Sequence, residues 1–370
     1  MVCWAVLGLV VASILRKRWL GPLAFAVILF FSLGLEISLW DYLILSESLS
    51  FSLFALLIAG WLGLGQLASG GRRSLWINIF LVALIFVATF FAFTRVSNVY
   101  LVLCGAIVFI LAGILKRTPP GSRHIYWIYA GFVLGLFVFQ NMTIRLGDRW
   151  QIHIFDNLVF RVIEDKEALE YFKATGLPVD EKVLALPQMS MAEYHQALFT
   201  SNEPSFMAVR DWVNKKGQSV YVRYLLEHPA KSLFAPLQNF DQLINGNNLE
   251  YRYELFPGQP VPGETMANDR KVYQRHPVVL VVFLVLQSFG ILLYWIGREC
   301  RQPAWLVITV MLLSIPLLAL IIWNANPLEI ERHAVQIGIQ FRLGGWLALL
   351  LWLDWLLLKV LPVPVNSTVS

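Results

Sequence analysis

The residues best suited to chemistry are charged side chains in three short segments that separate long apolar runs. These segments are residues 41–50, 95–98 and 324–342, and Glu36 lies about one turn before the first of them. A carboxylate or an imidazole can remove a proton from a hydroxyl group, and the planar guanidinium of arginine suits phosphate oxygens. The candidate proton acceptors are Glu47, Asp41 and His333, the candidate phosphate-binding residues are Arg95, Arg332 and Arg342, and the supporting candidates are Glu36, Ser46, Ser48 and Glu331.

Each group of candidates also has a simpler interpretation. Ser46 is a suitable N-cap for the apolar run that follows it, and Glu47 would favour the positive end of that helix dipole. Arg95, Arg332 and Arg342 could contact lipid head groups, and His333 could cap a helix. The acidic residues could be ordinary solvated loop residues.

The elements that position these residues are apolar helices. The chain is 58% hydrophobic and 14% charged, whereas a soluble domain carries about 25% charged residues. A membrane-spanning helix needs roughly 20 mainly apolar residues, and we predict an all-α transmembrane bundle of about nine such spans. The predicted spans are residues 1–15, 22–40, 49–67, 75–93, 100–115, 125–139, 277–296, 304–323 and 343–361.

Basic residues between the spans predict the orientation. With the N-terminus outside, 11 lysines and arginines fall in the inner connections and only Arg95, Arg332 and Arg342 fall in the short outer loops. This bias follows the positive-inside rule and places the C-terminus in the cytoplasm. The acids Asp41, Glu47, Glu329 and Glu331 then fall on the outer side, so we expect an outward-facing polar site.

Residues 143–276 interrupt the apolar pattern and predict an extracytoplasmic, mainly helical insert between two groups of spans, 1–142 and 277–370. The insert contains 17 of the 24 acidic and 15 of the 29 basic residues. Helical spacing predicts helices over residues 156–173, 205–216 and 219–228, which end at Gly176, Gly217 and Pro229 respectively. Residues 245–262 read as an irregular loop.

Several functional classes lack a signal. The three cysteines lie outside the insert, and no Cys-x-x-Cys or His-x-x-x-His spacing indicates zinc. No cofactor motif or phosphate-binding glycine loop occurs, although the sequence leaves dependence on a divalent metal open. The excess of basic residues follows the membrane orientation and does not indicate nucleic acid as a partner.

The order of these elements resembles the GT-C superfamily of integral-membrane glycosyltransferases, which use polyprenyl-phosphate-linked sugars. The resemblance rests on an apolar span, the basic turn of residues 16–21, a second span and an outer Ser46-Glu47-Ser48-Leu49 that opens a third. The insert resembles uncharacterised bacterial proteins of this kind in Arg149-Trp150, residues 176–178, residues 221–225 and His228-Pro229. Glu331-Arg332-His333-Ala334, followed by Gln340-Phe341-Arg342, also resembles them.

The resemblance implies a cell-envelope transferase in the bacterial plasma membrane that uses a polyprenyl-phosphate-sugar donor and contacts membrane lipids. Such enzymes begin with one further span and a large outer loop that carries an acidic residue proposed as the general base, and no residue here matches it. We therefore expect a truncated sequence, a degenerate relative or an enzyme that uses another acid. The alternatives are a non-enzymatic membrane scaffold or assembly subunit, and then a transporter, against which we find no internal repeat.

Overall fold

The computed structural model describes residues 1–34, 37, 46–69, 74–117, 123–147, 149–245, 273, 275–297, 302–325, 327 and 330–360. Every element in this described part of the chain is a helix. The chain divides into two compact units. The first comprises residues 1–140, 249–318 and 335–370, and the second comprises residues 141–248 and 319–334. The all-α prediction is therefore confirmed for the described residues, while the predicted boundaries at 142 and 276 stay a prediction.

Six helices are long and apolar enough to cross a membrane, as expected of an integral membrane protein. They are α4 (Ser46–Ser69), α5 (Ser74–Thr94), α7 (Arg123–Leu146), α18 (Val278–Ile296), α19 (Ala304–Ala325) and α20 (Ile330–Val360). Three shorter apolar helices are α1 (Val2–Ile14), α2 (Leu20–Ser32) and α6 (Asn98–Ile114). A helix of 13 residues, such as α1 or α2, is about 20 Å long and does not by itself cross a hydrocarbon layer of about 30 Å.

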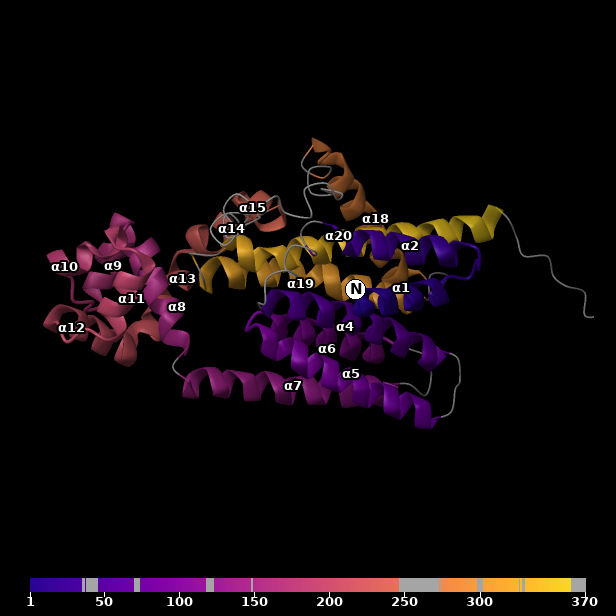
Figure 1. Ribbon diagram of the computed structural model, residues 1–370, viewed down its shortest axis with the longest axis horizontal. Coiled ribbons are helices and arrows are strands. Elements are labelled where there is room, and N and C mark those ends of the chain that lie inside the picture. The colour runs from indigo at the N-terminus through magenta and orange to yellow at the C-terminus, as the bar shows by residue number, and fades with distance from the viewer. Residues whose placement is uncertain are drawn as a thin grey trace, which may run out of the picture. The chain divides into compact units, whose positions relative to one another are not determined.

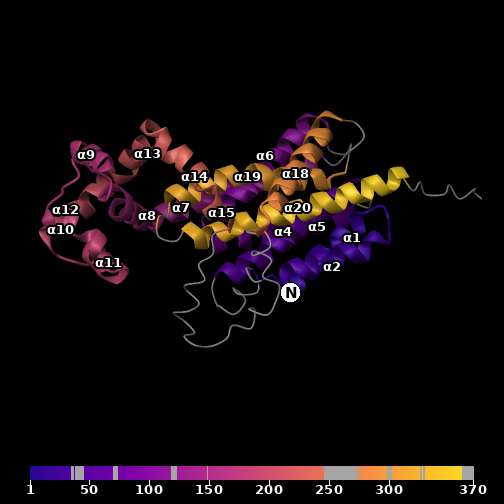
Figure 2. The same cartoon turned by 90° about the horizontal axis from the view of Figure 1, so that it is seen from above.

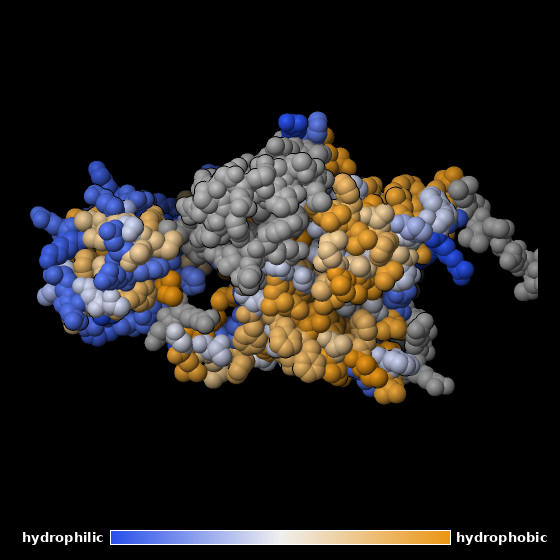
Figure 3. Space-filling view, in the orientation of Figure 1, coloured by the Kyte–Doolittle hydropathy of each residue, from blue (hydrophilic) through white to orange (hydrophobic). Residues whose placement is uncertain are grey.

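Helix α4 is central to the first unit and packs against both α1 and α5. The apolar window of α4 is 72% buried, against 28% for that of α5, whose other face is exposed. Small residues bring α4 and α5 together, because a Cβ on Gly60 would lie 2.6 Å from Leu84 and one on Gly63 would lie 2.8 Å from Phe80. Figures 1 and 2 show α1, α2, α4 and α5 running along a common direction, and in Figure 3 the surface of these apolar helices is mainly orange.

Two basic residues from the connections between apolar helices, Arg117 and Lys17, form hydrogen bonds with other helices of the first unit. Arg117 donates one hydrogen bond of 2.9 Å to the Gly297 carbonyl and a second to the Trp295 carbonyl, at the C-terminal end of α18. Such contacts satisfy carbonyls that a helix end leaves open. Asp354 on α20 is buried and accepts a hydrogen bond of 2.8 Å from the Lys17 backbone, in the turn between α1 and α2.

The second unit contains short helices around an aromatic core. They are α8 (Arg149–Asn157), η1 (Leu158–Val162), α9 (Lys166–Ala174), α10 (Glu181–Leu184), η2 (Leu186–Gln188), α11 (Met191–Phe199), α12 (Pro204–Trp212), η3 (Val213–Gly217), α13 (Gln218–Glu227), η4 (Ala230–Phe234), α14 (Ala235–Gln238) and α15 (Phe240–Asn245). Phe155, Phe172 and Tyr194 are fully buried in that core. This burial explains why the chain folds here despite its high content of charged residues.

Three predictions about helices are corrected. The single helix predicted over residues 156–173 is divided, because Asp165 caps a new helix, α9, by accepting hydrogen bonds from the backbone N–H groups of Glu167 and Ala168. Helix α9 then ends just before Gly176, whose φ of +94° suits glycine. The predicted helix end at Gly217 is wrong, because η3 leads through this buried residue directly into α13.

The third correction concerns residues 324–342, which the sequence analysis treated as a segment separate from the last predicted span. Instead, α20 begins at Ile330 and continues through Arg342 to Val360 as one helix of 31 residues. Gln336, Gln340 and Arg342 in its first half are buried, and α19 contacts one of them. The Gln340 amide donates hydrogen bonds to the Met311 carbonyl on α19 at 2.5 Å and to Ser314 Oγ at 2.7 Å.

Candidate functional site

A buried ion pair lies where α4 begins and α5 ends. Arg95 Nη2 lies 2.5 Å from Glu47 Oε1, and the side chains are only 6% and 0% exposed. Glu47 is in the first turn of α4, where the helix dipole also favours its negative charge. The structure thus brings together a predicted proton acceptor and a predicted phosphate-binding residue, although they are 48 residues apart in the sequence.

Hydrogen bonds beside this ion pair hold the two helix ends in register. The buried Asn98, at the start of α6, has its side-chain nitrogen 2.8 Å from Ser50 Oγ on α4 and 3.0 Å from the Phe91 carbonyl on α5. A buried polar network of this kind is costly to leave incomplete. The Glu47–Arg95 pair therefore lies beside a buried polar network that links α4, α5 and α6.

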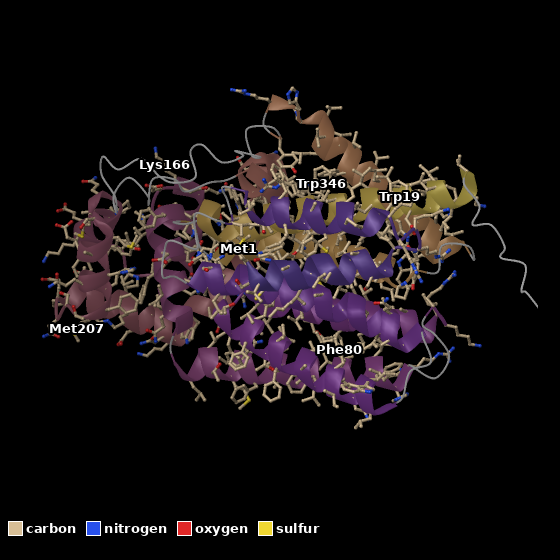
Figure 4. The ribbon with its side chains drawn as sticks, turned by 45° about the vertical axis from the view of Figure 1, so that its right-hand side comes forward. Met1, Trp19, Phe80, Lys166, Met207 and Trp346 are labelled. Atoms are coloured by element: carbon tan, nitrogen blue, oxygen red, sulfur yellow. The ribbon has the colours of Figure 1, made fainter. Side chains whose placement is uncertain are left out.

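Arg342 is the second buried arginine among the candidates, with 1% of the residue exposed. Its Nε donates a hydrogen bond of 3.0 Å to the Gly338 carbonyl, one turn earlier on α20. The centre of its guanidinium lies 5.2 Å from the centroid of the Tyr273 ring, within the range of a cation–π interaction. Trp346, labelled in Figure 4, donates a hydrogen bond of 3.1 Å to the Tyr273 hydroxyl. Arg342 is consequently held by an aromatic cluster.

The other candidates are described only in part. Glu36 and Asp41 lie outside the described residues, as do the side chains of Ser46, Glu331 and Arg332. Helix α4 begins at Ser46 itself. Ser48 on α4 and His333 on α20 are half-buried, and each has an interaction partner.

No protein family, curated protein or solved structure matches this chain.

The second unit contains a buried polar cluster that the sequence analysis did not single out. Asp156 on α8 accepts a hydrogen bond of 2.7 Å from the Tyr194 hydroxyl, and its Oδ1 lies 3.3 Å from Nε2 of His195. Burial is the main cause that raises the pKa of Tyr194, and the hydrogen bond with Asp156 raises this pKa further. Burial lowers the pKa of His153, an effect that Asp156 partly opposes. This cluster joins α8 to α11. The only feature of the sequence that indicated it was the acidic Asp156 within a predicted helix.

A second polar cluster of this unit binds the end of α19. Asn157 Nδ2 donates a hydrogen bond of 3.2 Å to the Ala325 carbonyl, and the Tyr221 hydroxyl donates one of 2.7 Å to the Asn324 carbonyl. The Arg161 guanidinium lies 5.3 Å from the centroid of the Trp323 ring. Burial raises the pKa of Tyr221 to about 12, although Arg161 opposes this shift. These side chains satisfy carbonyls that would otherwise remain open at the helix end.

A third set of contacts lies at the surface of the second unit. Lys231 Nζ lies 2.5 Å from Asp165 Oδ2 and 2.9 Å from Glu167 Oε2. The hydrogen bond from Lys231 is the main reason that the pKa of Asp165 is lowered. All three side chains are more than one third exposed, so solvent screening makes this a weak stabilising contact. Within the described residues, no group of three or more His, Cys, Asp or Glu side chains could hold a metal ion.

Proposed function

We propose that this protein is a GT-C-like membrane glycosyltransferase, or a degenerate relative, that binds a polyprenyl-phosphate-linked sugar at the outer face of a bacterial plasma membrane. In this proposal all nine apolar helices belong to the membrane bundle. The second unit lies outside the cytoplasm and the C-terminus lies inside. The acceptor is a lipid, a glycan or a protein.

The observation that carries the proposal is the burial of Arg95 and Arg342. A lipid head-group anchor extends its charge towards water, whereas these arginines are 8% and 1% exposed within the first unit. A charge buried among apolar helices costs several kcal/mol unless it is paired, and such residues by default indicate function. Arginines in such a position can stabilise the phosphate that leaves when a glycosidic bond forms.

The ion pair changes the role proposed for Glu47. One oxygen of the Glu47 carboxylate already contacts Arg95 at 2.5 Å, and the side chain is fully buried. Glu47 is better suited to hold Arg95 in position. The role of general base then falls to Asp41 or His333.

Binding of polyprenyl phosphate to the full chain in lipid nanodiscs tests the proposal. We expect Arg342→Ala to weaken binding about 10- to 100-fold, because a hydrogen bond to a charged group contributes roughly 1.5–3 kcal/mol. The exposed Arg18 provides a matched control, and Arg18→Ala should leave binding unchanged. Arg342→Lys keeps the charge and should retain more affinity than Arg342→Ala. A radiolabelled sugar donor then tests whether the bound lipid is used.

Equal binding by the wild type, Arg342→Ala and Arg18→Ala would remove the support for a phosphate site. The same result with no detectable sugar transfer would favour the scaffold alternative. A thermal unfolding curve for each variant separates loss of binding from loss of folding.

A further inference from the structure

The segment of α13, η4 and α14, residues 218–238, exposes an unusual number of large apolar side chains. The structure gives residues 149–245 nine exposed large hydrophobic residues, and five of them fall within this segment. These five are Val222, Leu226, Leu233, Phe234 and Leu237. Leu226 is the most exposed of them, at 76%. A protein surface that is exposed only to water rarely carries such a concentration of large apolar side chains.

The exposed residues lie opposite a well-packed face. On α13, Val220, Tyr221 and Tyr224 are buried in the core of the second unit. Val222 and Leu226 are four residues apart, so they share the other side of the helix. The exposed side of α13 also carries the charged Arg223 and Glu227. A helix with apolar and charged side chains on its outer side is typical of the interface between an apolar environment and water.

Hydrogen bonds place this segment next to the end of a candidate membrane span. The Tyr221 hydroxyl contacts the Asn324 carbonyl at 2.7 Å, and Asn324 Nδ2 donates a hydrogen bond of 3.0 Å to the Ser232 carbonyl. Asn324 is in the last turn of α19, and the end of a span lies at the boundary between membrane and water. Tyr221 and Ser232 directly precede the exposed Val222 and Leu233.

Charges near the apolar residues fit the same environment. Lys216 and Arg223 are exposed on or next to α13, where they can contact anionic head groups. Trp323, stacked under Arg161 at 5.3 Å, is a residue type enriched at membrane interfaces.

We propose that residues 218–238 lie in the surface of the same bilayer that α19 crosses. The five exposed apolar side chains contact the upper part of the acyl chains, and Arg223 contacts lipid phosphate. The second unit is then held at the membrane by this interfacial segment as well as by its chain connections. This inference does not depend on the proposed enzymatic activity.

Spin labels on the full chain in vesicles of phosphatidylcholine and phosphatidylglycerol test the proposal. In a background in which all three cysteines are replaced by serine, labels are attached after Leu226→Cys and Leu237→Cys. The controls are Leu184→Cys and Met207→Cys, since both residues are exposed on other helices of the second unit. Met207 is labelled at the surface in Figure 4. At each site, the collision rate of the spin label with oxygen is compared with its collision rate with a water-soluble nickel complex.

We expect oxygen collisions to exceed nickel collisions at positions 226 and 237, and the reverse at 184 and 207. Nickel accessibility at 226 and 237 equal to that of the controls would overturn the proposal, because the segment would be in water. Exclusion of both reagents from 226 and 237, in detergent as well as in vesicles, would also overturn it. That result would indicate a protein partner, such as a second copy of the chain.

Discussion

At the residue scale, the notable feature is charge buried among apolar helices. The sequence identified Glu47, Arg95 and Arg342 as candidates, because charged residues are rare near membrane spans. It could not predict that Glu47 and Arg95 contact each other at 2.5 Å. That contact depends on how α4 packs against α5 and α6, and the apolar pattern leaves this packing undetermined. Asp156 was missed for the related reason that an acid in a soluble helix usually faces water.

Removal of one member of the buried pair should destabilise the protein strongly. We expect Glu47→Gln to lower the free energy of unfolding by about 3–5 kcal/mol, because it leaves the charge of Arg95 in a site built around a carboxylate. Glu170→Gln provides the matched control, since the pair of Glu170 with Lys173 is 72% and 38% exposed and is worth about 0–1 kcal/mol. Thermal unfolding of both variants in detergent measures the difference. Equal midpoints would contradict a structural role for the Glu47–Arg95 contact.

At the scale of the elements, six of the nine predicted spans correspond to helices long and apolar enough to cross a membrane, and the other three correspond to the shorter helices α1, α2 and α6. The predicted span at 304–323 corresponds to α19, and that at 277–296 corresponds to α18, because length and hydropathy alone determine such helices. Boundaries inside the second unit were less predictable. Gly217 did not end a helix, because its small size allows close packing against Val213 and Ile154 rather than a left-handed turn.

Within the second unit, the contacts between α13 and the end of α19 depend on hydroxyl and amide side chains. We expect Tyr221→Phe to lower the free energy of unfolding by about 1 kcal/mol, because it leaves the Asn324 carbonyl without this donor. Tyr171→Phe removes a hydroxyl group whose hydrogen bond to Glu227 is exposed, so it should cost less. Denaturant unfolding of the full chain in detergent compares the two variants. An equal or larger effect at Tyr171 would contradict the role assigned to Tyr221.

At the scale of the whole molecule, composition and charge pattern predicted an all-helical membrane protein, and the six long apolar helices support that class. The sequence does not determine how α1 and α2, at 13 residues each, fit a bilayer about 30 Å thick. The surface is of two kinds. In Figure 3 the apolar helices are mainly orange and the charged second unit is mainly blue. Which side of the membrane the second unit faces follows only from the distribution of basic residues.

Thiol labelling of intact cells tests this central claim most directly. In the cysteine-free background, Lys182→Cys lies on α10 of the second unit, and Arg18→Cys lies in the basic turn between α1 and α2; both residues are exposed. A membrane-impermeant maleimide should label position 182 in intact cells and position 18 only after the cells are permeabilised. Labelling of position 18 in intact cells, with position 182 protected until permeabilisation, would reverse the topology and contradict a site at the outer face.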